Sequence, residues 1–164
     1  MEWIAGCFRN YANFRGRARR REFWYFTLFV FALLVAARIL DVLVFGYGGG
    51  PRLFSTVVLL LLFLPQLAVS VRRLHDTGRS GKLLLAYYVF GFILSVLVAY
   101  FGLQSLSDLL NGAEVRLSTA QLVVLGTGGV INFVWSIFFL VWYCLPGTRG
   151  ENVYGEDPKQ TVEE

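Results

Sequence analysis

Four long apolar runs alternate with short polar stretches along this chain of 164 residues. The runs cover approximately residues 23–45, 54–71, 83–103 and 122–145. Because a helix rises about 1.5 Å per residue, each run is long enough, or nearly so, to cross the ~30 Å hydrocarbon core of a bilayer. We predict an all-α integral membrane protein in which residues 1–164 form a single membrane domain, a bundle of four transmembrane helices.

Residues 1–22 show a different pattern. Apolar or small side chains recur every three or four positions, the spacing that places them on one face of a helix. These positions are Trp3, Ile4, Cys7, Phe8, Tyr11 and Phe14. Since a cluster of arginines follows, we predict a short N-terminal amphipathic helix and basic anchor in the plane of the lipid headgroups. A helix that packs on the protein's own cytosolic loops would show the same periodicity.

The composition supports a membrane location. The mean hydropathy is +0.58, and with 56% hydrophobic and 16% charged residues the chain is more apolar than a soluble domain of this length. The net charge of +4 comes from arginines beside the apolar runs, so nucleic acid is not an expected partner. Cys7 and Cys144 lack the spacing of a disulfide framework or metal site. We predict free thiols, no metal and no cofactor.

The basic residues are distributed unequally about the four runs. Twelve of the fifteen lysines and arginines lie before the first run, in residues 72–82 and in residues 146–164. The two other connections hold only Arg52 and Arg116. Because basic residues favour the cytoplasmic side of a membrane, we predict an N-in/C-in topology with a cytoplasmic loop at 72–82 and a cytoplasmic tail at 146–164.

A few polar residues interrupt the apolar runs. Arg38 and Asp41 lie three positions apart, and they could pair structurally near the membrane surface or take part in a proton or ion relay. Pro65 frees a backbone carbonyl that a neighbour such as Gln66 could satisfy, and Gln66 could alternatively bond to another helix. Asn132 could hydrogen-bond across helices or line a substrate path.

Three polar segments recur on the predicted cytoplasmic side. They read FRGRARRREFW at residues 14–24, RRLHDTGRSG at residues 72–81 and GTRGENVYGEDP at residues 147–158. In this order the segments resemble the family of small bacterial inner-membrane proteins known as domain of unknown function 805, DUF805. The resemblance extends over nearly the whole chain, although Lys82 stands where the family usually has an aromatic residue. It implies a multi-pass protein of the bacterial cytoplasmic membrane with no established activity.

The same segments contain most of the chain's candidate site residues. We expect them to meet at the cytoplasmic ends of the helices and to interlock as a polar network, because arginine, asparagine and carboxylate side chains can hydrogen-bond to one another. The predicted members besides arginine are Glu22, His75, Asp76, Asn152 and Asp157.

The excess of arginine suggests a binding role for this face. Guanidinium groups pair bidentately with phosphate, and basic clusters beside transmembrane helices attract anionic lipids. Anionic lipid headgroups are therefore the expected ligands, and a membrane-protein partner or a second copy of the chain is the alternative. The candidate residues are Arg17, Arg20, Arg21, Arg72, Arg73 and Arg79.

Two other classes of function remain open. A homo-oligomer could form a small transporter or channel that uses Arg38 and Asp41, with Gln66 and Asn132 also lining its polar path. A lipid-phosphate-modifying enzyme could use His75 and Asp76, with magnesium held by Asp76 and Asp157. No nucleophile motif or phosphate-binding loop supports catalysis, so an interaction protein is the preferred prediction.

Overall fold

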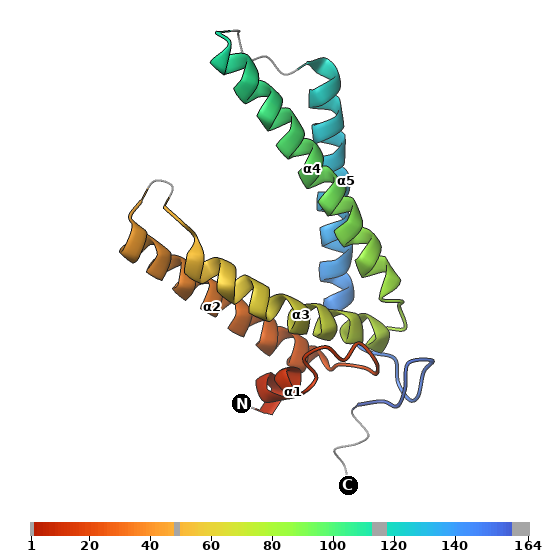
Figure 1. Ribbon diagram of the computed structural model, residues 1–164. Helices are drawn as coiled ribbons and strands as arrows, with labels where there is room; N and C mark the ends of the chain where they lie inside the picture. The colour runs from red at the N-terminus through yellow and green to blue at the C-terminus, as the bar shows by residue number, and fades with distance from the viewer. Residues whose placement is uncertain (1, 48–49, 113–117, 159–164) are drawn as a thin grey trace. The chain divides into compact units, whose positions relative to one another are not determined.

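The computed structural model describes residues 2–47, 50–112 and 118–158, most of them helical (Figure 1). In chain order the helices are α1 (Glu2–Arg9), α2 (Arg20–Phe45), α3 (Leu53–Asp76), α4 (Lys82–Leu110) and α5 (Thr119–Cys144). Within these ranges, β-structure is limited to one isolated bridge. Helices α2 to α5 are all long and apolar enough to cross a membrane. The prediction of an all-helical protein with four membrane-length helices is confirmed.

Helix α3 is longer than its apolar run. It continues to Asp76, so that Arg72–Asp76 are helical although the sequence pattern places them in the loop 72–82. Charged side chains do not end a helix, and arginines near its C-terminus interact favourably with the helix dipole. The helix ends where Gly78 adopts a φ of +74°, a conformation that favours glycine. In the same way α4 runs on to Leu110, beyond the end of the apolar run 83–103.

The chain divides into two compact units. The first contains α1, α2, α3 and the segment that begins at Tyr143. The second, Lys82–Trp142, contains α4 and most of α5. In the second unit Tyr87 and Phe90 of α4 contact Trp135 of α5 with ring centroids 6.1 and 5.9 Å apart. Most other large apolar side chains of these two helices are exposed, as expected for helices surrounded by lipid.

Helix α1 packs on the first turns of α2, as the first unit in Figure 1 shows. Cys7 is fully buried there beside Phe23 and Phe26, and the ring of Phe8 lies 5.6 Å from that of Phe26. Part of the apolar face of α1 thus packs on α2, while Phe8 on the same face is 41% exposed. The position of α1 in the plane of the headgroups stays a prediction.

Pro65 lies inside α3 and has no N–H to donate to the carbonyl of Leu61 four residues earlier. The hydroxyl of Tyr11, in the segment that follows α1, donates a hydrogen bond to that carbonyl at 2.5 Å. Gln66 takes the other role that the sequence allows and bonds to another helix, donating to Oγ1 of Thr27 on α2 at 3.1 Å. The freed carbonyl is therefore satisfied by the N-terminal segment.

Asp41 joins α2 to α3. Its carboxylate accepts hydrogen bonds from the backbone N–H groups of Phe54 and Ser55 at 2.8 and 3.0 Å, and from the Ser55 hydroxyl at 2.6 Å. It thereby satisfies donors at the N-terminus of α3, which have no partner within that helix. Arg38 is exposed on the same helix as Asp41, and no ion pair joins these two described side chains. The geometry gives Asp41 a structural role.

Removing this carboxylate is expected to destabilise the α2–α3 hairpin. In Asp41→Ala the melting temperature of the detergent-solubilised protein should fall clearly, because three hydrogen bonds at the start of α3 are lost together. Arg38→Gln is the matched control and should leave the melting temperature nearly unchanged. Equal losses in the two variants would show instead that an Arg38–Asp41 pair stabilises the hairpin.

Candidate functional site: a polar cap and an arginine pocket

Three segments far apart in the sequence meet in the first unit. Residues 16–22 lead into α2, residues 72–79 end α3, and residues 145–157 follow α5. We call these three segments the polar cap. At its centre the side chains of Arg17, Arg73 and Asp76 are almost completely buried, with exposed fractions of 1%, 0% and 6%.

The Asp76 carboxylate holds both buried guanidinium groups. Nε and Nη2 of Arg17 each lie 3.0 Å from Oδ1 of Asp76, and Nη1 of Arg73 donates to Oδ2. Arg73 also donates to the backbone carbonyls of Tyr143, in the last turn of α5, and of Leu145, directly after that helix. Because charged groups are costly to bury without partners, this arrangement fixes the end of α3 to both neighbouring segments.

The C-terminal segment wraps around Arg17. Nη1 of Arg17 donates to the carbonyl of Gly150 at 2.6 Å, and Nη2 donates to the carbonyl of Thr148. The N–H of Thr148 donates in turn to the carbonyl of Asp76 at 2.8 Å. Asp157, which is 7% exposed, accepts a hydrogen bond from the N–H of Gly150 at 3.1 Å. The loop after α5 is thus shaped by a residue that precedes α2.

His75 and Asn152 connect the same segments on another side of the cap. Nδ1 of His75 lies 3.2 Å from the carbonyl of Gly16, and the imidazole stacks on Tyr154 with ring centroids 3.9 Å apart. Asn152 donates to the carbonyl of His75 at 3.1 Å and to the hydroxyl of Thr148 at 2.9 Å. The described part of the chain therefore brings together the predicted members His75, Asp76, Asn152 and Asp157.

Gly147 approaches the centre of the polar cap. A Cβ atom at this position would lie 2.7 Å from Oδ1 of Asp76 and closer still to the other carboxylate oxygen. Such distances are shorter than van der Waals contact, so the chain can pass Asp76 here only with glycine.

Glu22 and Arg72 form a second ion pair at the edge of the cap. Nη1 of Arg72 lies 2.8 Å from Oε1 of Glu22, and the two side chains are 6% and 14% exposed. The same carboxylate oxygen accepts a hydrogen bond from the thiol of Cys7 at 3.7 Å. Burial, and then the negative charge of Glu22, raises the pKa of the Cys7 thiol to about 12.

Cys7 is expected to resist alkylation in the folded protein, while the exposed Cys144 reacts. At pH 8 a thiol with this pKa is ionised in only about one molecule in ten thousand, and the thiolate is the nucleophile. Because the folded pKa exceeds the unfolded value of 9.0, stability should fall as the pH rises from about 9 towards 12. Mass spectrometry after treatment with N-ethylmaleimide measures both sites, with denatured protein as the control. Equal labelling of the two folded thiols would contradict the buried Cys7–Glu22 contact.

The geometry at His75 and Asp76 does not favour the enzyme interpretation. Asp76 faces two arginines, and the His75 ring faces the carbonyl of Gly16 and the ring of Tyr154. A magnesium ion at Asp76 would have to displace the guanidinium groups of Arg17 and Arg73. Among the described residues no group of three or more histidine, cysteine or acidic side chains is placed to hold a metal ion.

Of the polar residues suggested for transport, Asp41 and Gln66 belong to the first unit. Asp41 caps α3, and Gln66 bonds to Thr27 further along the first unit. Asn132 belongs to the second unit, where its amide nitrogen lies 3.5 Å from the position of a Cβ on Gly91. Asp41 and Gln66 thus have separate partners within the first unit, and the position of Asn132 beside Gly91 fits the packing role that the sequence also allows.

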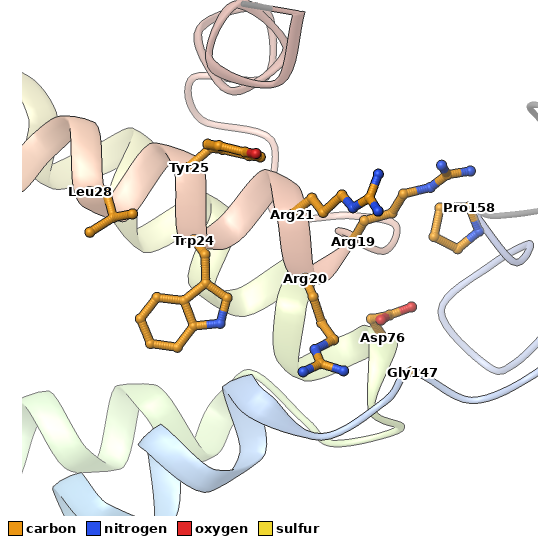
Figure 2. A pocket seen from close by; sticks show the side chains of 9 residues that line it. All are labelled: Arg19, Arg20, Arg21, Trp24, Tyr25, Leu28, Asp76, Gly147 and Pro158. Carbon is orange, nitrogen blue, oxygen red and sulfur yellow. The ribbon is translucent and has the colours of Figure 1, made fainter.

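A pocket opens beside the polar cap on the first turns of α2 (Figure 2). It has a volume of about 680 Å³, and Figure 2 shows Trp24 following Arg20 along one side of the helix. We call it the arginine pocket. It is lined by Arg19, Arg20, Arg21, Trp24, Tyr25, Leu28, Asp76, Gly147 and Pro158. The pocket combines basic groups at the start of α2 with an apolar wall one to two turns further on.

The predicted headgroup-binding arginines have three different arrangements. Arg17, Arg72 and Arg73 are buried and paired with carboxylates, so their guanidinium groups stabilise the polar cap and do not form an open binding surface. Arg20 and Arg21 are exposed and line the arginine pocket. A third arrangement holds for Arg79, which donates to the carbonyl of Thr77 at 3.2 Å.

Sequence reasoning missed some lining residues of the arginine pocket. Arg19 lies beside the two exposed arginines, and Trp24, Tyr25 and Leu28 form the apolar wall. The signal that could have identified them is the aromatic run directly after the arginine cluster. In the sequence this run indicates an interfacial belt, and a helix places its members close to the arginines three and four residues earlier.

Comparison with known proteins assigns the chain to a family. Residues 11–156 match the family described as "Protein of unknown function (DUF805)". Inner membrane protein YhaI of Escherichia coli K12 is 31% identical over 159 residues, 97% of this chain and 97% of that protein. Inner membrane protein YhaH of the same strain is 31% identical over 160 residues, 97% of this chain and 98% of that protein. No solved structure matches the chain.

These relatives and the four apolar helices agree on the location. The helices have the length and composition of membrane spans, and both relatives are inner membrane proteins. The chain is thus a multi-pass protein of the bacterial inner membrane. Its match over residues 11–156 takes in nearly all of the polar cap, and the chain belongs to the DUF805 family.

Proposed function

We propose that this protein is a non-enzymatic membrane protein that binds anionic phospholipid headgroups in the arginine pocket, on the cytoplasmic face of the membrane. The observation that carries the proposal is the lining of the pocket. Arginines and an apolar aromatic wall occur together on the first turns of a membrane-length helix. A phospholipid has the same sequence of properties, a charged phosphate followed by an apolar body.

The basic part of the pocket is available for binding. Arg20 and Arg21 are exposed, and neither belongs to an ion pair within the described residues. A basic side chain close to an anionic membrane surface contributes about 1 kcal/mol to lipid attraction. Two or three such residues attract an anionic lipid more strongly than a zwitterionic one, because a zwitterionic headgroup has no net charge.

The apolar part fits the boundary between headgroups and acyl chains. Trp24, Tyr25 and Leu28 lie four to eight residues beyond Arg20, which corresponds to about 6–12 Å along a helix. Aromatic side chains are enriched at this depth in membrane proteins because they are partly apolar and partly polar. The polar cap supports the pocket, since Asp76 and Gly147 belong to both.

The cytoplasmic assignment depends on the uneven distribution of basic residues. It is tested separately by fusing a reporter after the last residue of the chain. Green fluorescent protein should fluoresce at this position and alkaline phosphatase should be inactive. The opposite result would place the polar cap and the arginine pocket in the periplasm.

Lipid binding is tested by exchanging two arginines. Arg20→Gln with Arg21→Gln should reduce the phosphatidylglycerol that co-purifies with the protein, measured by native mass spectrometry against phosphatidylcholine. The matched control is Arg9→Gln with Arg15→Gln, which removes the same charge from exposed positions outside the pocket. Lipid retention should survive in the control. If it is lost equally in both variants, or in neither, the pocket is not the binding site.

A further inference from the structure

The exposed residues Arg20 and Arg21 are neighbours at the start of α2, and both line the arginine pocket. Successive residues of an α-helix are rotated by about 100°, so their side chains leave the helix on different sides. Figure 2 shows the Arg20 side chain on the side of Trp24 and the Arg21 side chain next to Arg19. The pocket therefore offers two separate, accessible guanidinium groups.

Each of these arginines is followed by an aromatic residue about one turn further along α2. Trp24 lies four residues after Arg20, and Tyr25 lies four residues after Arg21. Residues four apart on a helix are neighbours on one face, so each pair forms a strip that is basic at the helix start and aromatic beyond it. Leu28 lies four residues after Trp24 and three after Tyr25, so it extends both strips.

Both strips belong to the lining of one cavity. Its volume of about 680 Å³ is far larger than a single phosphate group, so a second phosphate group has room beside the first. Tyr25 and Leu28 are 55% and 59% exposed, which leaves the apolar end of the pocket open to acyl chains. The arginine pocket can therefore hold a headgroup with two phosphates.

The charges in the pocket also favour a ligand with two negative charges. Within the described ranges neither Arg20 nor Arg21 belongs to an ion pair. The acidic residue of the lining, Asp76, is bound to the buried guanidinium groups of Arg17 and Arg73. One negative and two positive charges leave this buried group with a net positive charge, which does not repel a phosphate. A singly charged headgroup would neutralise only one of the two exposed arginines.

We infer that the arginine pocket binds a phospholipid with two phosphate groups, a lipid of the cardiolipin class, with one phosphate at Arg20 and the other at Arg21. Guanidinium groups pair bidentately with phosphate oxygens, and basic pockets at the ends of transmembrane helices suit such headgroups. The acyl chains then follow Trp24 and Tyr25 towards Leu28. The inference rests on the proposed function, because it names the class of lipid that the same site selects.

Joining two phosphates in one molecule strengthens binding without a new kind of contact. Once the first phosphate is bound, the second is held at a high effective concentration beside the other arginine. Two separate phosphatidylglycerol molecules would each lose their own translational freedom. The attraction of one basic residue near an anionic surface corresponds to about fivefold in affinity. Cardiolipin should therefore be preferred over phosphatidylglycerol by about fivefold or more at equal phosphate concentration.

The preference is measured by native mass spectrometry on the full chain in detergent, with cardiolipin and phosphatidylglycerol offered together at equal phosphate concentration. The unaltered chain should retain one cardiolipin about fivefold more often than phosphatidylglycerol. Arg20→Gln and Arg21→Gln, each made alone, should lower this preference to less than about twofold, because only one phosphate then has an arginine partner. Phosphatidylglycerol should still be retained by both single variants, since one exposed arginine remains.

Arg15→Gln is the matched control for the single variants. It removes one positive charge from an exposed position that precedes α2 and lies outside the pocket lining, so the preference for cardiolipin should not change. All three substituted side chains are exposed, and equal melting temperatures in detergent should show that the variants fold as the unaltered chain does. An equal loss of preference in the control and the pocket variants would overturn the inference, because general attraction of anions would explain it.

The outcomes separate this inference from the proposed function. If the unaltered chain retains the two lipids equally, or binds two phosphatidylglycerol molecules in place of one cardiolipin, the inference is overturned and the proposed function stands. If neither lipid is retained, both are overturned. A preference for cardiolipin that survives in both single variants also overturns the inference, because Arg20 and Arg21 would then not hold separate phosphates.

Discussion

Replacing Asp76 by asparagine is expected to destabilise the first unit by about 3–5 kcal/mol, the range observed when one partner of a buried ion pair is removed. The substitution preserves the size of the side chain but removes the charge that balances Arg17 and Arg73. Two buried guanidinium groups would then share a neutral amide. Denaturant unfolding in detergent micelles, followed by tryptophan fluorescence, measures the loss.

The matched control for this variant is Glu156→Gln. Glu156 is an exposed carboxylate in the C-terminal segment and belongs to no ion pair found in the described residues. Its replacement should change the free energy of unfolding by less than about 0.5 kcal/mol. Similar values for the two variants would mean that Asp76 does not hold the buried arginines.

Gly147→Ala is expected to cost about 3 kcal/mol, at the upper end of the range for overpacking a close-packed site. The added Cβ would overlap the Asp76 carboxylate. The carboxylate cannot move away without breaking its ion pair with Arg17 or Arg73. Thermal unfolding of the detergent-solubilised protein measures the effect. Asp76→Asn and Gly147→Ala should be less than additive in combination, because both act on the same carboxylate.

Gly6→Ala provides the comparison for this glycine. A Cβ on Gly6 in α1 would meet no atom within 4 Å, and alanine is the better helix former. Gly6→Ala should therefore be neutral or stabilising by up to about 1 kcal/mol. If both glycines tolerate alanine equally, the close approach at Gly147 does not limit stability.

The helices and the members of the polar cap could be predicted from the sequence for different reasons. Hydrophobic runs report membrane-length helices directly, because lipid requires a continuous apolar surface. The meeting of His75, Asp76 and Asn152 followed from placing three polar segments on the same side of the membrane. That argument needs only the distribution of basic residues, and no knowledge of side-chain directions.

The roles of individual arginines could not be predicted in this way. Arg17 and Arg21 are four residues apart in one basic cluster, yet Arg17 is buried against Asp76 and Arg21 is exposed. Which residue turns inwards depends on where α2 begins, and helix boundaries are poorly marked when arginines surround them. The end of α3 at Asp76 could not be located from the sequence for the same reason, since charged residues allow a helix to continue.

Burial of Arg17 has a consequence for biosynthesis. The carbonyls of Thr148 and Gly150, which accept its hydrogen bonds, lie 131 and 133 residues later in the chain. While the ribosome is still producing α4 and α5, the guanidinium N–H groups of Arg17 have only water or Asp76 as partners. Closure of the polar cap around Arg17 is therefore complete only after the segment that follows α5 has been synthesised.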